Sequence, residues 1–235
     1  MIRSLDTLYK SVHLLQKRQE NSNSNIANTN TTGYKAKSLF QRTLEEVPLH
    51  NYEDGIKMDQ RHEIGGFTFG NELAGAYLNA ERGALKNTER LTDFALNGEG
   101  YFTIRMNNGQ LAYTRNGNFI KNDQNQLLTQ EGYQVLGANN QPIVMQDNVK
   151  PNFLITNFQD ESALISNGDT YYTSNQPGQV IQGSVVQGYL EGSNVSVADE
   201  MVKMIQTSRE FEANQKALQT VNETLDKAVN ELGRV

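Results

Sequence analysis

The sequence predicts a mixed α and β fold, with long N- and C-terminal helices that pair as a coiled coil and an inserted β-rich domain of short antiparallel strands. Three observations predict it. Apolar residues recur in a heptad pattern near the N-terminus, they do so again near the C-terminus, and the period changes to two between them. A chain of 235 residues is long enough for one sizeable domain or two small ones.

The first helix is predicted from a row of residues on alternating steps of three and four. The row consists of Leu5, Leu8, Val12, Leu15, Gln19, Ser22 and Ile26. Its second half becomes polar, and the run of Asn and Ser at 21–25 has poor helix propensity, so we expect weak helicity there. Gly33 is the expected stop.

The last helix has a stronger signal. Ser196 and Asp199 form a capping box, and the heptad row then continues for over four repeats. The row consists of Met201, Met204, Ser208, Phe211, Gln215, Leu218, Asn222, Leu225, Val229 and Leu232. Such a helix would be roughly 55 Å long. An amphipathic helix lying on its own domain is the alternative, but the length and the polar seam positions favour a coiled-coil partner.

The middle of the chain reads as short strands. Residues 101–106 and 111–114 flank the turn Asn107-Asn108-Gly109, which is a hairpin signal. Further strands are expected at 119–121, 126–129, 133–136 and 153–155, as in a sandwich or small barrel. The predicted organisation is a discontinuous helical assembly domain at 1–40 and 195–235, an extended arm or loop at 41–75, and a β-rich domain at 76–194.

Composition argues against several classes of protein. The net charge of -6 is spread along the chain without a basic block, which weighs against nucleic acid or an anionic membrane as partner. The absence of cysteine excludes disulfides, thiolate metal sites and a cysteine nucleophile. We also expect no membrane insertion and no cleavable secretory signal, because no long apolar stretch occurs and the N-terminus lacks the signal-peptide pattern.

Residues that could carry chemistry are sparse. The histidines are His13, His50 and His62, and none has the paired spacing of a helix-borne zinc motif. The glycines near residue 98 lack the Lys-Ser/Thr pair of a phosphate loop and indicate a tight turn. Asp93 and Glu99 flank that turn as a carboxylate pair of the kind that cleaves glycosides, but no catalytic set surrounds them. We therefore expect no catalytic residues, no metal and no cofactor.

Four collinear blocks of the sequence resemble the rod and hook proteins of the bacterial flagellum, most closely the distal-rod type. They lie at 25–35, 93–102, 113–137 and 188–209. The motif residues within them are Asn25, Ala27, Asn28, Gly33, Tyr34, Asn97, Gly98, Gly100, Gly117, Ser193 and Asn194. The middle is too short for the large outer domain that hook proteins usually carry, which favours a rod protein.

The resemblance implies a structural subunit of the flagellar basal-body rod, not an enzyme. It implies polymerisation into a hollow axial tube that transmits torque from motor to hook, with paired terminal helices on the inner wall. Implied partners are copies of the chain, other flagellar rod and hook subunits, and the flagellar type III export apparatus. That apparatus would deliver the protein to an extracytoplasmic place in the basal body without a cleaved signal peptide.

The expected assembly seam consists of the apolar members of both heptad rows: Leu5, Leu8, Val12, Leu15, Ile26, Met201, Met204, Phe211, Leu218, Leu225, Val229 and Leu232. Alternatives are a proximal-rod or hook subunit, a β-rich cell-wall-binding or hydrolytic protein, and a phage-tail or secretion-needle subunit. A hydrolase would need a carboxylate pair in a groove lined with aromatic rings, and the four blocks argue against a tail or needle subunit.

Overall fold

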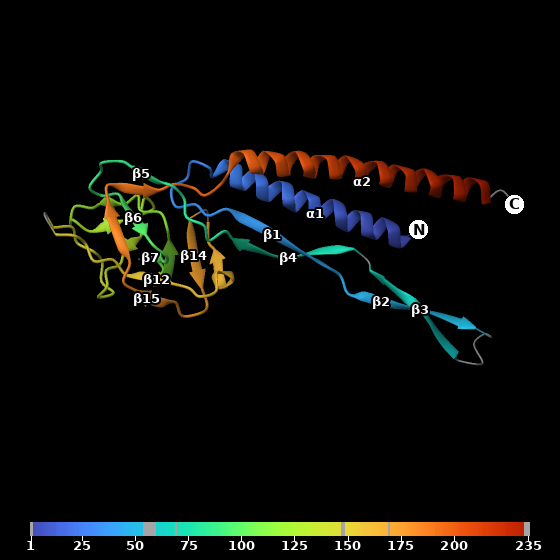
Figure 1. The fold of residues 1–235 in the computed structure, drawn as a ribbon, viewed down its shortest axis with the longest axis horizontal. Coiled ribbons are helices and arrows are strands. Elements are labelled where there is room, and N and C mark those ends of the chain that lie inside the picture. Colours follow the sequence, from blue (N-terminus) through green and yellow to red (C-terminus); the bar gives the residue numbers. More distant parts are fainter. Residues whose placement is uncertain (1, 54–59, 69, 147–148, 169, 233–235) are drawn as a thin grey trace. The chain divides into compact units, whose positions relative to one another are not determined.

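The computed structural model describes residues 2–53, 60–68, 70–146, 149–168 and 170–232. A helix lies near each end of the chain, and strands occupy the middle (Figure 1), so the mixed fold with terminal helices is confirmed. The chain forms two compact units. Unit 1 contains Met1–Asn23, Leu39–Ala76 and Ala198–Val235, and unit 2 contains Ser24–Ser38 and Tyr77–Val197.

The two helices begin and end close to the predicted positions. Helix α1 covers Ile2–Ala27, and helix α2 covers Val197–Leu232 with two acidic residues in its first turn. Helix α1 continues through 21–25, where the sequence predicts weak helicity. Ser22 and Asn25 in that run are 5% and 1% exposed, so contacts of their side chains compensate for poor intrinsic propensity.

Two side-chain contacts join the helices within unit 1. The Arg18 guanidinium donates to the Glu210 carboxylate at 2.7 Å, and the Asn214 side-chain amide donates to the Ser11 hydroxyl at 2.8 Å. The later residue of α1 meets the earlier residue of α2, so the two helices run antiparallel where they touch. Figure 1 shows them side by side over this stretch.

The arm at 37–78 is built from paired strands. Strand β1 (Lys37–Thr43) pairs with β4 (Asn71–Leu78), and β2 (Glu46–Glu53) pairs antiparallel with β3 (Gln60–Thr68). The sequence predicts this stretch only as an extended arm or loop and assigns it no strands. Its large apolar side chains are poorly covered, with Phe40 58% and Tyr77 52% exposed.

Unit 2 holds the remaining strands. They are β5 (Leu85–Asn87), β6 (Phe94–Asn97), β7 (Tyr101–Arg105), β8 (Leu111–Thr114), β9 (Ile120–Lys121), β10 (Leu127–Leu128), β11 (Gln134–Val135), β12 (Ile155–Asn157), β13 (Leu164–Ser166), β14 (Tyr171–Ser174), β15 (Gln179–Ile181), β16 (Ser184–Gln187) and β17 (Tyr189–Glu191), with a 3-10 helix at Glu161–Ala163. The main sheet runs in the order β13-β14-β8-β7-β11-β10-β9.

Strand β7 is the centre of this sheet. It forms the predicted hairpin with β8, in which Phe102 lies opposite Thr114 and Arg105 opposite Leu111. Its other edge pairs with both β11 and β12, and β12 pairs in turn with β15. Smaller antiparallel pairs join β6 to β16 and β5 to β17. The β5–β17 pair matters most for the ends of the chain, because β17 lies six residues before α2.

The core of unit 2 is aromatic. Phe94, Phe102, Phe119 and Phe153 are each at most 5% exposed, and their ring centroids lie 4.8–6.3 Å apart. Such tilted and edge-on pairs add to the stability gained from burial. A second cluster contains Tyr101, Phe158, Leu164 and Tyr172. The unit therefore has an extensive apolar core of its own.

Candidate functional site

Three charged side chains are buried together in unit 2, and we call them the ionic junction: Lys35, Arg115 and Glu191. The Lys35 ammonium lies 2.8 Å from one Glu191 carboxylate oxygen, and the Arg115 guanidinium lies 3.2 Å from the other. Their side chains are only 2%, 5% and 1% exposed. A charge is taken out of water only at a large desolvation cost, so each member depends on the others.

Backbone groups complete the hydrogen bonding of the junction. Lys35 also donates to the carbonyl of Glu81 at 2.6 Å, and Arg115 to the carbonyl of Gly98 at 2.9 Å. The carboxylate of Glu191 accepts a further bond from the backbone N–H of Gly83 at 3.2 Å. Five separate stretches of the chain are thereby held at one place, including the one that follows α1 and the one that precedes α2.

Gly33 brings the chain leaving α1 into this site. Its N–H donates to the carbonyl of Glu191 at 2.8 Å, and its φ is +69°. A β-carbon at this position would overlap the backbone of Arg115 and Asn116. Only glycine fits both the left-handed backbone and the close approach. The predicted stop signal of the first helix is thus also a point of contact with the β-rich unit.

Asn25 joins the last turn of α1 to the residues that follow the helix by hydrogen bonds. Its side-chain oxygen accepts from the backbone N–H of Lys37 at 3.0 Å and from the Tyr34 hydroxyl at 3.1 Å. Its side-chain nitrogen donates to the carbonyl of Lys37 at 2.9 Å. Asn25 and Tyr34 are 1% and 0% exposed. A buried amide with its partners satisfied in this way fixes the path of the chain as it leaves the helix.

Asn194 makes the matching connection before α2. Its side-chain oxygen accepts from the backbone N–H of Ala36 at 2.7 Å. Its side-chain nitrogen donates to the carbonyls of Asn79 and Glu81 at 2.9 and 2.8 Å. The chain after α1, the chain before α2 and the chain entering unit 2 from the arm are therefore connected through one side chain.

The remaining motif residues have varied surroundings. Gly98 supplies a carbonyl to Arg115, as above, and at Gly117 a β-carbon would overlap the carbonyl of Phe94. Asn28 donates to the carbonyl of Ser24 at 3.0 Å in the turn after α1. Gly100 is buried against Ile155, the Ser193 hydroxyl accepts from the N–H of Val195, and Ala27 and Asn97 are exposed.

The expected seam residues of α1 lie on its less exposed side. Leu15 is 4% exposed, and Leu5, Leu8, Val12 and Ile26 are half-buried. Leu14, which the heptad row does not include, is also buried, at 8%. Helix α1 is therefore covered over a wider arc than a single seam requires.

Of the two heptad positions expected to form the seam of α2, one is covered in the structure. Met204, Phe211, Leu218 and Leu225 are half-buried, whereas Met201 and Val229 are 52% and 70% exposed. The side chain of Leu232 lies outside the described part of the chain.

At the second expected heptad position, the covered residues lie one place earlier in the sequence than predicted. Ser208, Gln215 and Asn222 are exposed, and the less exposed positions beside the Met204 row are Thr207, Asn214, Val221 and Ala228. A one-residue shift turns the helix face by about 100°. The side of α2 that faces its own chain therefore leaves Met201 and its neighbours Val202 and Ile205 uncovered, at 53% and 55% exposure.

The members of the ionic junction were not singled out from the sequence, although all three lie inside the resembling blocks. The sequence contains one signal for them, because each is a charged residue that stands beside residues expected to be buried. Lys35 follows the Gly33-Tyr34 turn, Arg115 precedes the tight Asn116-Gly117 turn, and Glu191 ends a strand. Sequence spacing alone gives no indication that residues 35, 115 and 191 meet.

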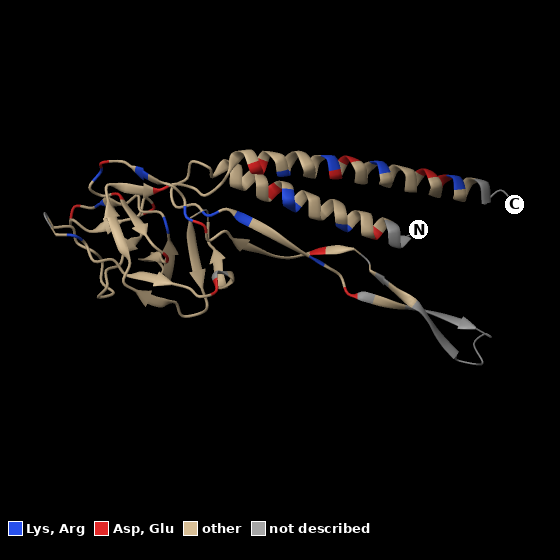
Figure 2. Ribbon diagram, viewed as in Figure 1, with Lys and Arg blue, Asp and Glu red and all other residues tan. Residues whose placement is uncertain are grey.

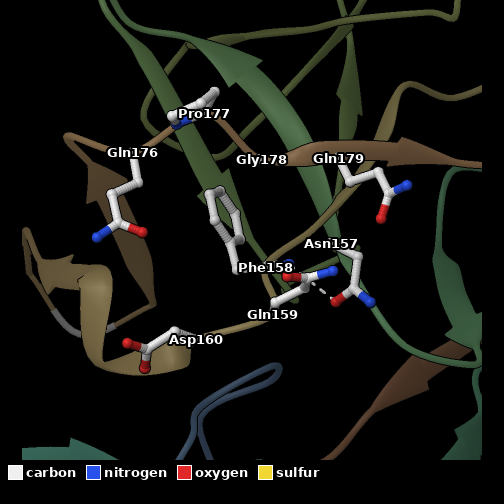
Figure 3. A pocket seen from close by; sticks show the side chains of 8 residues that line it. All are labelled: Asn157, Phe158, Gln159, Asp160, Gln176, Pro177, Gly178 and Gln179. Carbon is white, nitrogen blue, oxygen red and sulfur yellow. Dashed lines mark hydrogen bonds between the residues drawn. The ribbon is translucent and has the colours of Figure 1, made fainter.

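A polar hollow on unit 2 bears on the hydrolase alternative. It has a volume of about 470 Å³, and Phe158 lies at its centre among Gln176, Pro177 and Gln179 (Figure 3). Asp160 is the one carboxylate that lines it, and hydrogen bonds from Ser162 lower its pKa. The Phe158 ring is 7% exposed and packs edge-on against Tyr101 and Tyr113. Glycoside hydrolysis uses two carboxylates, and this hollow supplies one.

Few other groups among the described residues are candidates for a chemical role. No group of three His, Asp or Glu side chains there is arranged to hold a metal ion. His13 is exposed on α1, whereas the side chains of His50 and His62 lie outside the described part. None of the helices described is both long and apolar enough to cross a membrane.

Comparison with known proteins places this geometry in a family. The domain described as "Flagellar hook protein FlgE/F/G D1 domain" matches residues 95–159, which include β7 and most of the main sheet. The domain described as "Flagellar basal body rod FlgEFG protein C-terminal" matches residues 186–231, which include Glu191, Asn194 and α2.

Whole-chain similarity extends to flagellar basal-body rod proteins FlgG. The protein of Buchnera aphidicola from Acyrthosiphon pisum is 30% identical over 95% of this chain and 98% of its own length. Those of Buchnera aphidicola from Baizongia pistaciae and of Borreliella burgdorferi are each 29% identical, over 86% and 98% of this chain and 89% and 98% of their own lengths. With similarity of this extent, the chain belongs to the flagellar basal-body rod protein family.

Proposed function

We propose that this chain is a structural subunit of the flagellar basal-body rod and polymerises through its terminal helices into the hollow axial tube that transmits torque from motor to hook. Residues 1–40 and 195–235 form the assembly domain, 41–75 the arm, and 76–194 the β-rich domain. The observation that carries the proposal is the pair of helices, one from each end of the chain, which retain uncovered apolar side chains after they have met each other.

The antiparallel contacts support pairing of the helices as a coiled coil. Ser11–Asn214 and Arg18–Glu210 both join residues beside the half-buried heptad rows. Polar pairs of this kind set the register of helices more than they add stability. The seam residues Leu5, Leu8, Val12, Leu15, Ile26, Met204, Phe211, Leu218 and Leu225 supply its apolar contacts, and Met201, Val229 and Leu232 extend the assembly surface to neighbouring copies.

The ionic junction supports the mechanical role. A subunit that carries torque needs a firm connection between its assembly helices and the rest of its chain. Within unit 2, Asn25, Gly33, Lys35 and Asn194 hold the stretch that leaves α1 and the stretch that leads into α2 through buried hydrogen bonds and ion pairs. Such groups separate only at the cost of leaving buried charges or amides without partners.

The remaining parts of the proposal follow the family. The partners are copies of the chain and other rod and hook subunits. The flagellar type III export apparatus delivers the subunit to its extracytoplasmic place in the basal body without a cleaved signal peptide. The chain binds no nucleic acid and no cofactor and catalyses no reaction.

Electron microscopy of purified basal bodies tests this proposal. A short epitope inserted at the exposed turn 107–109 leaves both helices and the ionic junction intact. Antibody against the epitope should label the rod in cells that carry the tagged chain in place of the native one, and cells without the gene should lack a complete rod. Intact, motile basal bodies without the gene, or label absent from the rod, would contradict the proposal.

A further inference from the structure

Unit 1 contains a groove between α1 and the arm strands. Its floor is apolar, formed by Leu14, Leu44 and Leu73, and its α1 side carries Lys10, His13 and Lys17. The volume is about 340 Å³. Leu73 remains 40% exposed, so the floor is open to a further side chain.

The charges around this groove are available to a partner. Lys10 and Lys17 pair with Asp6 and Glu20 on their own helix, at 3.0 and 2.8 Å, in exposed contacts that contribute little stability. The acidic residue at the rim, Glu72, is paired with Arg42 of the arm. The α1 side of the groove is thus basic, while its floor is apolar.

The end of α2 extends past the start of α1. Ser11 lies nine residues after the first residue of α1, whereas Asn214 lies 18 residues before the last residue of α2. Because the helices are antiparallel at this contact, α2 continues about 13 Å past the start of α1. We call residues 224–232 the overhang.

The overhang is amphipathic. Leu225, Ala228 and Val229 follow helical spacing on one side, and Val229 is 70% exposed because α1 no longer covers it. Asp226 is exposed beside them, and Lys227 is exposed on the other side of the helix. Figure 2 shows both acidic and basic residues along this end of α2.

We propose that the groove formed by Leu14, Leu44 and Leu73 receives the overhang of α2 from a second copy of this chain. The inference rests on the proposed polymerisation and names the surfaces that meet. Val229 and Leu225 enter the apolar floor, while Asp226 lies against Lys10 and Lys17. Apolar contact supplies the attraction, and the charges fix the orientation of the inserted helix.

The position of the two surfaces makes the contact head-to-tail. His13 and Leu14 lie close to the level of Asn214, so the groove and the overhang of one chain are separated by roughly 20 Å along the helices. A chain therefore cannot fill its own groove with its own overhang. Different patches of the two copies meet, which is the kind of interface that produces an open filament rather than a closed dimer.

Cysteine cross-linking tests the contact, because the native chain has no cysteine to give background. His13→Cys and Val229→Cys are combined in one chain, and purified basal bodies are oxidised. Disulfides form only when the Cα atoms approach within about 7 Å. We expect a ladder of cross-linked copies. The matched control combines His13→Cys with Val202→Cys, an exposed valine on the opposite side of α2, and should give single chains only.

A charge reversal supplies a second, independent variant. Lys17→Glu should lower incorporation of the subunit into rods about tenfold or more, equivalent to roughly 1.4 kcal/mol, because it places a carboxylate beside Asp226. Asp226→Lys in the same chain should restore incorporation. Glu212→Lys, which changes another exposed acidic residue of α2 outside the overhang, should not restore it.

The outcomes separate this inference from the proposed function. A ladder specific to Val229→Cys and rescue specific to Asp226→Lys support it. Equal cross-linking through Val202→Cys, rods without any ladder, or rescue by Glu212→Lys would overturn the docking while the rod assignment stands. Absence of even the native chain from basal bodies would overturn the proposed function, and the docking with it.

Discussion

The two units of the molecule differ in how completely they bury their own side chains. In unit 2, Phe102, Ile104, Phe119 and Leu127 are 0% exposed, and even a triad of charges is almost inaccessible to solvent. In unit 1 the corresponding large side chains of α2 are at best half-buried, and Met201, Val202 and Ile205 are more than half exposed. Unit 2 has an extensive buried core of its own, although Leu91, Ile165 and Val180 on its surface are more than half exposed, whereas unit 1 has few fully buried side chains.

This difference indicates that the two units have different roles. Exposed apolar residues that follow a helical repeat mark a surface for further association. A buried ionic network contributes little net stability compared with an apolar core, but it is costly to break in part. Mutations in unit 2 should therefore act on folding of the single chain, and mutations on the helices should act mainly on assembly.

The largest effect on the single chain is expected at the ionic junction. Glu191→Gln removes the buried carboxylate that both Lys35 and Arg115 contact, so the free energy of unfolding should fall by about 3–5 kcal/mol. Urea unfolding of the purified protein, followed by tyrosine fluorescence, measures it.

The matched control for the junction is Glu99→Gln. Glu99 is exposed and accepts one hydrogen bond from Asn157 at 3.2 Å, so this change should alter stability by less than about 0.5 kcal/mol. If the Glu191 variant is as stable as the Glu99 variant, the contrast between the two units is wrong.

Local signals explain what could be predicted from the sequence. The helices follow from heptads and a capping pattern, and the β7–β8 hairpin from two strands around Asn107-Asn108-Gly109. The ionic junction could not be predicted, because Lys35, Arg115 and Glu191 are far apart in sequence and their meeting depends on the tertiary fold. The β2–β3 pair was missed because its residues lack a clean period of two.

The α2 face illustrates a different limit. The row Met204, Phe211, Leu218 and Leu225 fits two heptad frames, one with Ser208 and Gln215 and another with Thr207 and Asn214. Sequence favoured the first, and the covered side of the helix follows the second. The choice depends on what α1 offers opposite, here the Ser11 hydroxyl that Asn214 reaches. Two partners on different sides of α2 would use both frames.

A smaller effect is expected where α1 enters unit 2. Asn25→Ala removes three buried hydrogen bonds, two of them to backbone groups of Lys37, which should cost about 1–3 kcal/mol. Asn23→Ala, an exposed change on the same helix, should be nearly neutral. Limited proteolysis of the purified variants should show faster cleavage between residues 24 and 38 for Asn25→Ala only. Equal cleavage of the two variants would mean that the helix is not anchored through Asn25.

The smallest effect is expected at the contact between the helices. Arg18 and Glu210 are 29% and 51% exposed, so their coupling in a double-mutant cycle of Arg18→Ala and Glu210→Ala should be only about 0.2–1 kcal/mol. It should weaken further as salt rises. Zero coupling at low salt would argue against antiparallel pairing of the helices in the single chain.

The central claim is that the helices assemble and unit 2 folds without them, and Leu218→Asp tests it most directly. The change puts a charge on the heptad row of Met204, Phe211, Leu218 and Leu225, which belongs to both heptad frames. Truncation of a buried leucine alone costs roughly 2–5 kcal/mol. Lys216→Ala, an exposed change two residues away, is the control. Cells carrying each variant are scored for rods and motility, and circular dichroism follows thermal unfolding of the purified proteins.

We expect Leu218→Asp to retain the thermal unfolding of unit 2 and to form no rods, while Lys216→Ala assembles and swims normally. Loss of the unit 2 transition together with assembly would show that the two units do not fold independently. Rods and swimming equal to those of the Lys216→Ala control would contradict the claim that this face of α2 forms the working interface.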